Sequence, residues 1–340
     1  MTASGSLLLE RFPFPHVLDN TMYELWKTCP HKFFRSTVQG LKAAQRDPNT
    51  GALLTVKNIH LHFGGALARG LEVTRKTYLA EGNQGDAIQD GAAALLAFWG
   101  SEPLPPPTTR NEENKTLEAC LLAHDEYFRA FPLDDPQHHI PSPDHVEVSG
   151  TAPIPGVVHP FTGEPILYAG RFDAITSRFG VLRGLDDKTT SDNVDSDRWR
   201  SKWTLAGQFT GYTWLAQQYG FPIEGFLVHG VQILKASLKF GEAITPRTPF
   251  HVNTWLAQLC FDVQMMLRQY GAFIQSVEDD NGEWTDPPHP FAQRLGDACF
   301  HYMRKCSFLD DVCDTPRPAD FIPNAFVVER WNPLARSIDE

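Results

Sequence analysis

The sequence lacks any apolar run near the roughly 20 residues that a membrane-spanning helix needs, so we expect no membrane contact. Its first residues, MTASGSLLLERFPF, have no basic stretch and only a three-leucine run, unlike a secretory signal peptide. Hydrophobic residues make up 42% of the chain and charged residues 21%, which is ordinary for a globular protein. We therefore predict a cytoplasmic protein, and its 340 residues can bury one elaborated core or two.

Positive charge is also scarce. The formal net charge is −11, which counts against a general nucleic-acid binder. Acidic residues can themselves be metal ligands, however, and a groove can be locally basic in an acidic chain. Between positions 171 and 202, lysines and arginines are nearly balanced by aspartates. Charge alone therefore does not decide between classes of partner.

The most informative stretch is Tyr168–Ser191, which predicts two short strands joined by a turn at 178–180. Asp173 precedes Asp186 by a separation that lets a hairpin place both carboxylates at one end of a sheet. Two carboxylates and Lys188 there are suited to hold a divalent metal and to steady developing negative charge. The alternative is ordinary strand-end charges with a solvated lysine, because short motifs often occur by chance.

Three motifs follow one another in order: G-x-x-D at 170–173, D-x-K-T-T at 186–190 and Q-x-x-x-Y at 208–212. This series resembles the PD-(D/E)XK nuclease superfamily, and within it the RecB-like branch that includes AddB, the CRISPR adaptation nucleases and many phage exonucleases. The resemblance spans roughly 22–313, most of the chain. It implies an α/β fold in which a mixed sheet is flanked by helices.

The resemblance also implies site residues. The catalytic set would be Asp173, Asp186, Lys188, Gln208 and Tyr212. Asp173, Asp186 and the Asp187 carbonyl would bind Mg²⁺ or Mn²⁺, and Lys188 would orient the attacking water or stabilise charge on the phosphate. Gln208 and Tyr212 would lie near the site and contact DNA or the catalytic network, although Tyr212 equally suits a core aromatic.

One position departs from the family pattern. The helix predicted over 58–81 should carry G-x-x-x-H-x-x-L-E, but Ala68 stands at the histidine position. His60 and His62 lie on the preceding turn, and neither matches. Glu72 then either serves as a metal ligand from one turn further on or is a solvated surface glutamate. Ala68 is the feature that favours a second reading, a catalytically inactive DNA-binding or complex-assembly protein with the nuclease fold.

Cysteine is rare, with six in the chain, and three of these stand seven residues apart near the C-terminus. Cys299, Cys306 and Cys313 together with Cys29 provide four thiolates, the number needed for an iron–sulfur cluster or a structural zinc. One cysteine before the core and three after it resembles the iron-staple nucleases, which implies a 4Fe–4S cluster. The family's typical C-x2-C-x5-C ending is C-x6-C-x6-C in this sequence. The alternative is that the three C-terminal cysteines lie on one face of a single helix and pack in the core.

The resemblance suggests three segments: 1–57 with the first cluster cysteine, a nuclease core over 58–245, and a C-terminal helical and iron–sulfur segment over 246–340. It further implies exonucleolytic action on single-stranded DNA or DNA ends in recombination, repair or phage DNA processing, with a helicase or recombination protein as a candidate partner.

Three further features fall inside or beside the predicted core. The predicted strand 145–153 carries Glu147, which is more typical of an edge-strand charge than of a site residue. His138 and His139 fall in a predicted loop and receive no role. Trp199, in a polar segment predicted over 192–203, either stacks on unpaired bases or packs beneath the loop.

Overall fold

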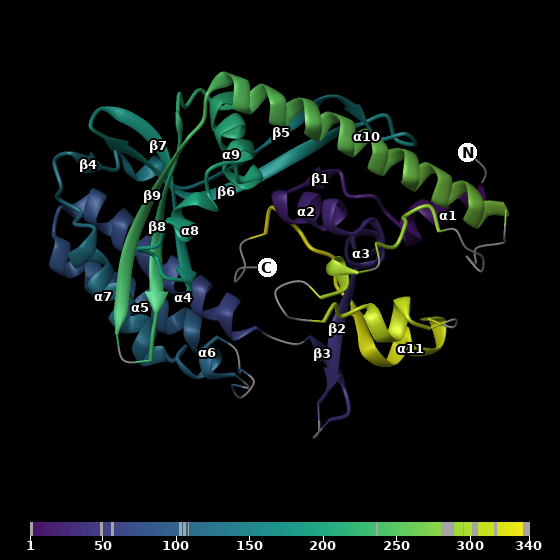
Figure 1. Cartoon of the computed structure of the whole chain (residues 1–340), viewed down its shortest axis with the longest axis horizontal. Coiled ribbons are helices and arrows are strands. Elements are labelled where there is room, and N and C mark those ends of the chain that lie inside the picture. The colour runs from purple at the N-terminus through teal and green to yellow at the C-terminus, as the bar shows by residue number, and fades with distance from the viewer. Residues whose placement is uncertain are drawn as a thin grey trace. The chain divides into compact units, whose positions relative to one another are not determined.

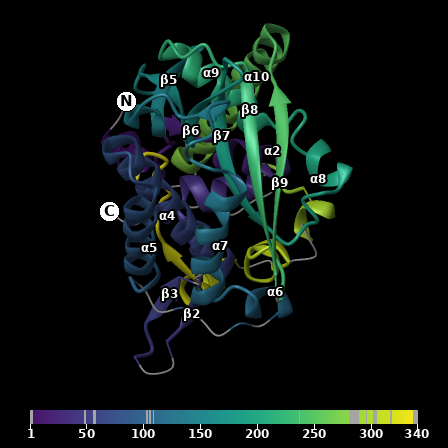
Figure 2. The same ribbon diagram turned by 90° about the vertical axis from the view of Figure 1, so that its left-hand side faces the viewer.

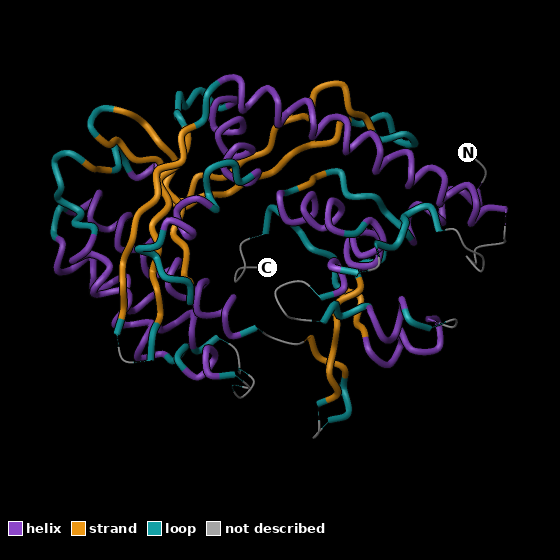
Figure 3. Tube along the Cα trace, viewed as in Figure 1, coloured by secondary structure: helices purple, strands orange, loops and turns teal. Residues whose placement is uncertain are grey.

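The structure is a computed structural model that describes residues 3–47, 50–55, 58–101, 104, 107, 109–235, 237–279, 289–294, 296–300, 305–315 and 318–335. It is α/β, with a mixed sheet flanked by helices, as predicted (Figures 1 and 3). Two compact units form from discontinuous segments. The first contains Met1–Val56, Thr151–Ala169 and Ala257–Leu334, and the second contains Lys57–Gly150, Gly170–Leu256 and Ala335–Glu340. The three-segment division from the sequence stays a prediction.

The sheet of the second unit is built on β6 (Pro165–Arg178), β7 (Val181–Thr190), β8 (Gly225–Ile233) and β9 (Leu238–Pro246). β6 and β7 are antiparallel, β7 and β8 parallel, and β8 and β9 antiparallel. β4 (His138–His139) and β5 (Val146–Val158) both pair with β6. Every residue of β8 is buried, as expected for an apolar strand covered on both faces.

Helices cover the two faces of this sheet with different apolar clusters. One face packs against α4 (Ile59–Glu81), α5 (Gln84–Trp99) and α7 (Leu117–Ala130), with Val231 and Ile233 in the contact. Figure 2 shows these three helices gathered together. The other face packs against α8 (Asp197–Ser201) and α9 (Gly207–Gln218) through Phe226 and Val228. The short α6 (Arg110–Glu113) and η2 (Pro143–His145) complete the unit.

The first unit has an aromatic core. Phe12 and Phe14, after α1 (Ala3–Arg11), pack on Phe273 and Tyr270 of α10 (Pro249–Asp279), each pair with centroids 5.2 Å apart. Its remaining elements follow in chain order: β1 (Val17–Leu18), α2 (Asn20–Thr28), α3 (Pro30–Phe33), η1 (Phe34–Val38), β2 (Leu41–Arg46), β3 (Leu53–Thr55), η3 (Asp297–Cys299), η5 (Leu309–Cys313), α11 (Pro318–Ala325) and β10 (Phe326–Val328). β1 runs parallel to the start of β6, and β10, β2 and β3 form a small antiparallel sheet.

The segment over 192–203 differs from its predicted loop. It contains α8, which begins where the Ser196 side chain accepts a hydrogen bond from the Trp199 backbone N–H. Trp199 is only 1% exposed and belongs to the core on the α9 face of the sheet. This burial decides in favour of packing and against base stacking for Trp199. No helix among the described residues has the length and apolarity needed to cross a membrane.

Candidate active site

The candidate site begins where β6 and β7 stop pairing. Their antiparallel ladder runs from Arg178–Val181 to Ala174–Leu185 and ends one step before Asp173 and Asp186. There the Asp173 carboxylate accepts a hydrogen bond of 2.5 Å from the Asp187 backbone N–H. The side chain thus satisfies a backbone donor that the strand ladder leaves unpaired. The predicted hairpin is present, and it brings both aspartates to the end of the ladder.

Asp186 and Lys188 are two residues apart on β7 and therefore face the same side of the sheet. The Lys188 Nζ lies 2.6 Å from Asp186 Oδ2, and the Asp186 residue is 4% exposed. Burial lowers the pKa of Lys188, but the Asp186 carboxylate outweighs it, so the pKa is raised. Lys188 consequently keeps its positive charge.

The Q-x-x-x-Y pair lies beside Lys188. Gln208 Nε2 donates a hydrogen bond of 3.1 Å to the Tyr212 hydroxyl, and the Lys188 Nζ lies 6.0 Å from the ring centroid of Phe209 on the same helix, α9. Gly170 permits this arrangement, because a Cβ there would lie 2.7 Å from Tyr212 Cδ1. The glycine of G-x-x-D and the tyrosine of Q-x-x-x-Y are therefore in direct packing contact.

Negative charge accumulates around Asp173. Burial raises the pKa of Asp173 well above its usual value, and the charges of Asp187, Asp186 and Glu147 raise it further. Burial likewise raises the pKa of Asp186 despite Lys188. Carboxylate oxygens are the donors that Mg²⁺ and Mn²⁺ prefer, so the chemistry of these side chains fits such an ion, although among the described residues they are not placed closely enough to hold one.

Glu147, for which the sequence favoured an edge-strand charge over a site residue, is half-buried and its charge acts on Asp173. It is the second residue of β5 and has a φ of 57°, a left-handed backbone conformation that is uncommon for a non-glycine residue. Its Oε2 lies 3.6 Å from Arg171 Nε. Burial raises its pKa, and the nearby Glu72 carboxylate raises it further. The strand pattern gave no signal for this placement, because one alternating strand does not reveal which carboxylates another element brings to it.

Glu72 is buried but already neutralised. On α4, its two carboxylate oxygens lie 2.8 Å from Arg69 Nη1 and 2.6 Å from Lys76 Nζ. Burial raises the pKa of Glu72, and these two cations together bring it below its usual value. Ala68, one turn earlier, is half-buried and offers no ligand. Glu72 is therefore not the solvated surface glutamate of the alternative reading.

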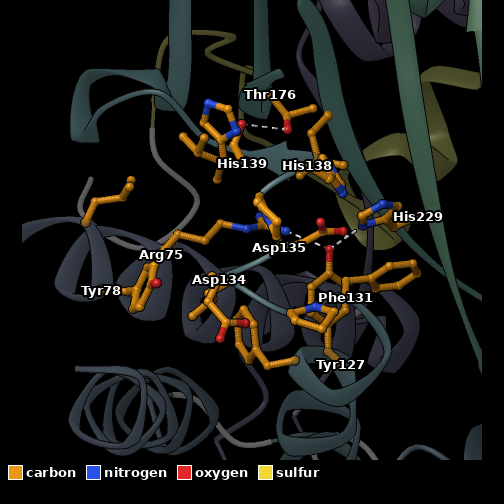
Figure 4. Close-up of a pocket in the computed structure, with 17 residues that line it drawn as sticks. Arg75, Tyr78, Tyr127, Phe131, Asp134, Asp135, His138, His139, Thr176 and His229 are labelled. Carbon is orange, nitrogen blue, oxygen red and sulfur yellow. Dashed lines mark hydrogen bonds between the residues drawn. The ribbon is translucent and has the colours of Figure 1, made fainter. Parts of the chain in front are cut away.

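Asp187 points to the opposite side of the sheet from Asp186. Its carboxylate lies 2.7 Å from Arg75 Nη1 and accepts a hydrogen bond of 2.6 Å from the Tyr127 hydroxyl. The same hydroxyl lies 2.6 Å from His229 Nδ1, and the His229 ring stacks on Phe131 at 3.7 Å (Figure 4). Burial raises the pKa of Asp187, but Arg75 and its other partners bring it below its usual value. None of these partners appeared among the sequence candidates.

The four candidate cluster cysteines lie together in the first unit. Cys29, Cys299, Cys306 and Cys313 line one small cavity, together with the basic residues Lys32 and Arg294. All six cysteines are free thiols. Burial raises the pKa of Cys313 to about 11, with the other three cysteines adding to the shift.

The cysteine cavity is not arranged as a finished metal centre. Within the described part of the chain, no three His, Cys, Asp or Glu side chains are placed closely enough to hold a metal ion. The single-helix alternative is also wrong, because Cys299 ends η3 and Cys313 ends the separate η5. The backbone N–H of Cys306 instead donates to the Cys299 carbonyl at 2.8 Å, which brings these two residues together.

Comparisons with known proteins add little. No protein-family model matches the sequence, and no curated protein matches it. Among solved structures, the chain is similar to one titled "Crystal structure of SSO0001", with a TM-score of 0.24 and 16% identity over 60% of this chain and 85% of that one. A similarity this low carries no argument about fold or function.

Proposed function

We propose that this chain is a metal-dependent deoxyribonuclease of the RecB-like PD-(D/E)XK type. The observation that carries the proposal is the convergence of three separated motifs at the end of the β6–β7 ladder. Asp173 accepts from the Asp187 N–H, Asp186 holds Lys188, and α9 packs Tyr212 against Gly170. Folding alone does not require a buried carboxylate pair, a charged lysine and a polar helix face at one point, and burying such groups is costly.

Within this proposal each side chain has a defined task. Asp173, Asp186 and the Asp187 carbonyl would hold Mg²⁺ or Mn²⁺, which when bound supplies a water of lowered pKa and polarises the scissile phosphate. Lys188 keeps its charge beside Asp186 and stabilises the negative charge that builds on the phosphoryl oxygens. Gln208 and Tyr212 bond to each other and so fix the face of α9 near Lys188.

Glu147 is the better candidate than Glu72 for a further metal ligand. Glu72 would have to give up two close cations before it could bind a metal, whereas the nearest cation to Glu147 lies 3.6 Å away. Burial is the main cause that raises the pKa of Glu147, and the Glu72 carboxylate adds to it, even though Arg171 lies nearby. This assignment would compensate for the histidine that Ala68 replaces.

For the cysteine cavity we propose a 4Fe–4S cluster, with zinc as the alternative. Four free thiols line one cavity, and its basic lining residues suit a centre made anionic by four thiolates. Metal analysis of anaerobically purified protein distinguishes iron from zinc. An iron–sulfur cluster also gives an absorption shoulder at roughly 400 nm, whereas a zinc site gives none. Protein that carries neither metal, with Cys306→Ala unchanged in stability, would remove the cofactor from the account.

The test of the nuclease proposal is degradation of end-labelled single- and double-stranded DNA with Mg²⁺, with Mn²⁺, or with a chelator. We expect metal-dependent cutting that consumes DNA from its ends. The second candidate, an inactive DNA-binding or assembly protein, rests on Ala68 and predicts DNA binding without cutting. Absence of both binding and cutting would reject both candidates.

A further inference from the structure

A cavity of about 290 Å³ lies within the second unit, and Figure 4 shows the residues that line it. Tyr127, Phe128 and Phe131 in its lining place it on the α7 side of the sheet. It is open on one side and lined by the end of α4, by α7 and the loop that follows it, by β4, and by β6, β7 and β8. The carboxylate pair Asp173–Asp186 is not part of its lining, so the nuclease proposal does not use this cavity.

The wall of the cavity is aromatic and aliphatic. Tyr78, Phe128 and Phe131 contribute rings, and Leu79, Leu133 and Leu185 contribute aliphatic surface. The Phe131 ring is fixed by its stacking on His229, at an interplanar angle of 6°. A ring-lined cavity of this size suits a flat ligand, because aromatic faces stack favourably on other ring systems.

The polar groups of the cavity offer both donors and acceptors but no unpaired cation. Arg75 is 3% exposed and its charge is matched by Asp187, 2.7 Å away. Burial is the main cause that lowers the pKa of His138 to about 4, so this ring is neutral near pH 7. Asp134 and Asp135 add two carboxylates to the lining. The two carboxylates would therefore repel an anionic ligand. A purely apolar ligand would leave the polar atoms of the lining without hydrogen-bond partners.

We propose that this cavity is a binding site for an uncharged nucleobase, a planar heteroaromatic ring that carries both N–H donors and acceptors. The base could belong to a free nucleoside or to a nucleic-acid strand, and the cavity recognises the same chemistry in each. The neutral His138 ring offers one N–H donor and one acceptor nitrogen, while the carboxylates of Asp134 and Asp135 accept from ring N–H or amino groups. This site needs neither metal nor cleavage and so goes beyond the nuclease proposal.

The experiment titrates the four deoxynucleosides, and separately their 5′-monophosphates, into metal-free full-length protein and follows binding by calorimetry. We expect at least one deoxynucleoside to bind, and more tightly than its monophosphate. Leu133→Trp, which fills the cavity, should weaken binding by roughly tenfold or more, while Leu122→Trp on the exposed side of α7 should not. Thermal unfolding checks both variants for folding, and Leu79→Trp replaces Leu133→Trp if the latter fails to fold.

Competition then identifies the source of the base. Displacement of the nucleoside by a short single-stranded oligonucleotide, but not by the same backbone made of abasic sites, assigns the base to a strand. If neither the oligonucleotide nor the abasic strand displaces the bound nucleoside, the cavity is assigned to a free nucleoside. The proposal is overturned if no deoxynucleoside binds at millimolar concentration, if cavity filling leaves binding unchanged, or if the monophosphate or the abasic strand binds as well as the base.

Discussion

At the residue scale, Asp187 joins two networks through different atoms. Its carboxylate lies among Arg75, Tyr127 and His229, and its backbone N–H holds the Asp173 carboxylate. Its neighbour Asp186 faces the other side and pairs with Lys188. Because successive side chains of a strand point to opposite faces, Asp186 and Lys188 lie on one face of the sheet and Asp187 lies on the other. Asp187 therefore belongs to the site through its backbone and to the fold through its side chain.

Arg75→Met should be strongly destabilising. It leaves the buried Asp187 carboxylate without its cation, and breaking a buried ion pair typically costs about 3–5 kcal/mol. Arg69→Met, on the same helix, removes a half-exposed partner of Glu72 that Lys76 still neutralises, so we expect a loss of about 1 kcal/mol or less. Urea unfolding of both variants measures the difference, and equal losses would show that the Arg75–Asp187 pair is unimportant.

Glu147→Gln should weaken Mn²⁺ binding by about 10-fold or more, as expected for loss of a metal ligand or of a residue that orients one. Glu72→Gln should have a smaller effect, because two cations already occupy that carboxylate. Calorimetric titration of Mn²⁺ into each variant measures this order. A larger loss in Glu72→Gln would restore the family-like assignment and remove Glu147 from the metal site.

At the element scale, the contact between β6 and α9 depends on one glycine. Gly170→Ala would place a methyl group 2.7 Å from Tyr212 Cδ1 and 2.9 Å from Leu215 Cδ2, so α9 must shift. Overpacking of this kind costs about 1–3 kcal/mol, and Tyr212→Ala should recover part of it in the double variant. Gly271→Ala, on α10 with no atom within 4 Å of the added methyl group, should instead stabilise by about 0.5–1 kcal/mol.

Denaturant unfolding of the single and double variants tests the β6–α9 contact. Additive losses in the double variant would mean that Gly170 and Tyr212 are not coupled.

The elements predicted from the sequence have local signals. The region predicted as a helix over 58–81 contains α4, and the turn signal at 178–180 lies at the junction of β6 and β7. Motif order indicated Asp173, Asp186 and Lys188. Tyr127, in contrast, lies 60 residues from Asp187 and 102 from His229, so no local pattern connects them. The cavity lined by His138 and His139 was missed for the same reason. The sequence predicts a loop there, whereas the structure pairs these residues, as β4, with β6.

At the scale of the whole molecule, each unit contains segments that are distant in sequence, because the chain passes between the two units more than once. The chain passes from one unit to the other within β5, β6 and α10. Sequence composition carries no mark of such crossings, because a strand or helix keeps the same periodicity on both sides of them.

Folding stability should fall as the pH drops from about 6.5 toward about 4. Burial, first among the causes, lowers the pKa of His138 to about 4 and that of His289 to about 3. In the unfolded chain these groups titrate near about 6.5, so within this window the unfolded state binds protons that the folded state does not. Urea unfolding at about pH 7 and about pH 5 measures the loss, and His289→Gln should reduce it. Stability that is unchanged across this window would contradict the buried, neutral state of these rings.

The central claim is that the Asp186–Lys188 pair performs phosphodiester cleavage. The most direct measurement is single-turnover degradation of end-labelled DNA with Mn²⁺ by wild type, Asp186→Ala, Lys188→Ala and a control, Arg129→Ala, which removes an exposed cation of α7. The account predicts metal-dependent cutting by wild type and control, and loss of about 100-fold or more in both site variants. Cutting that survives in either site variant, or no cutting by wild type on any DNA end, would contradict it.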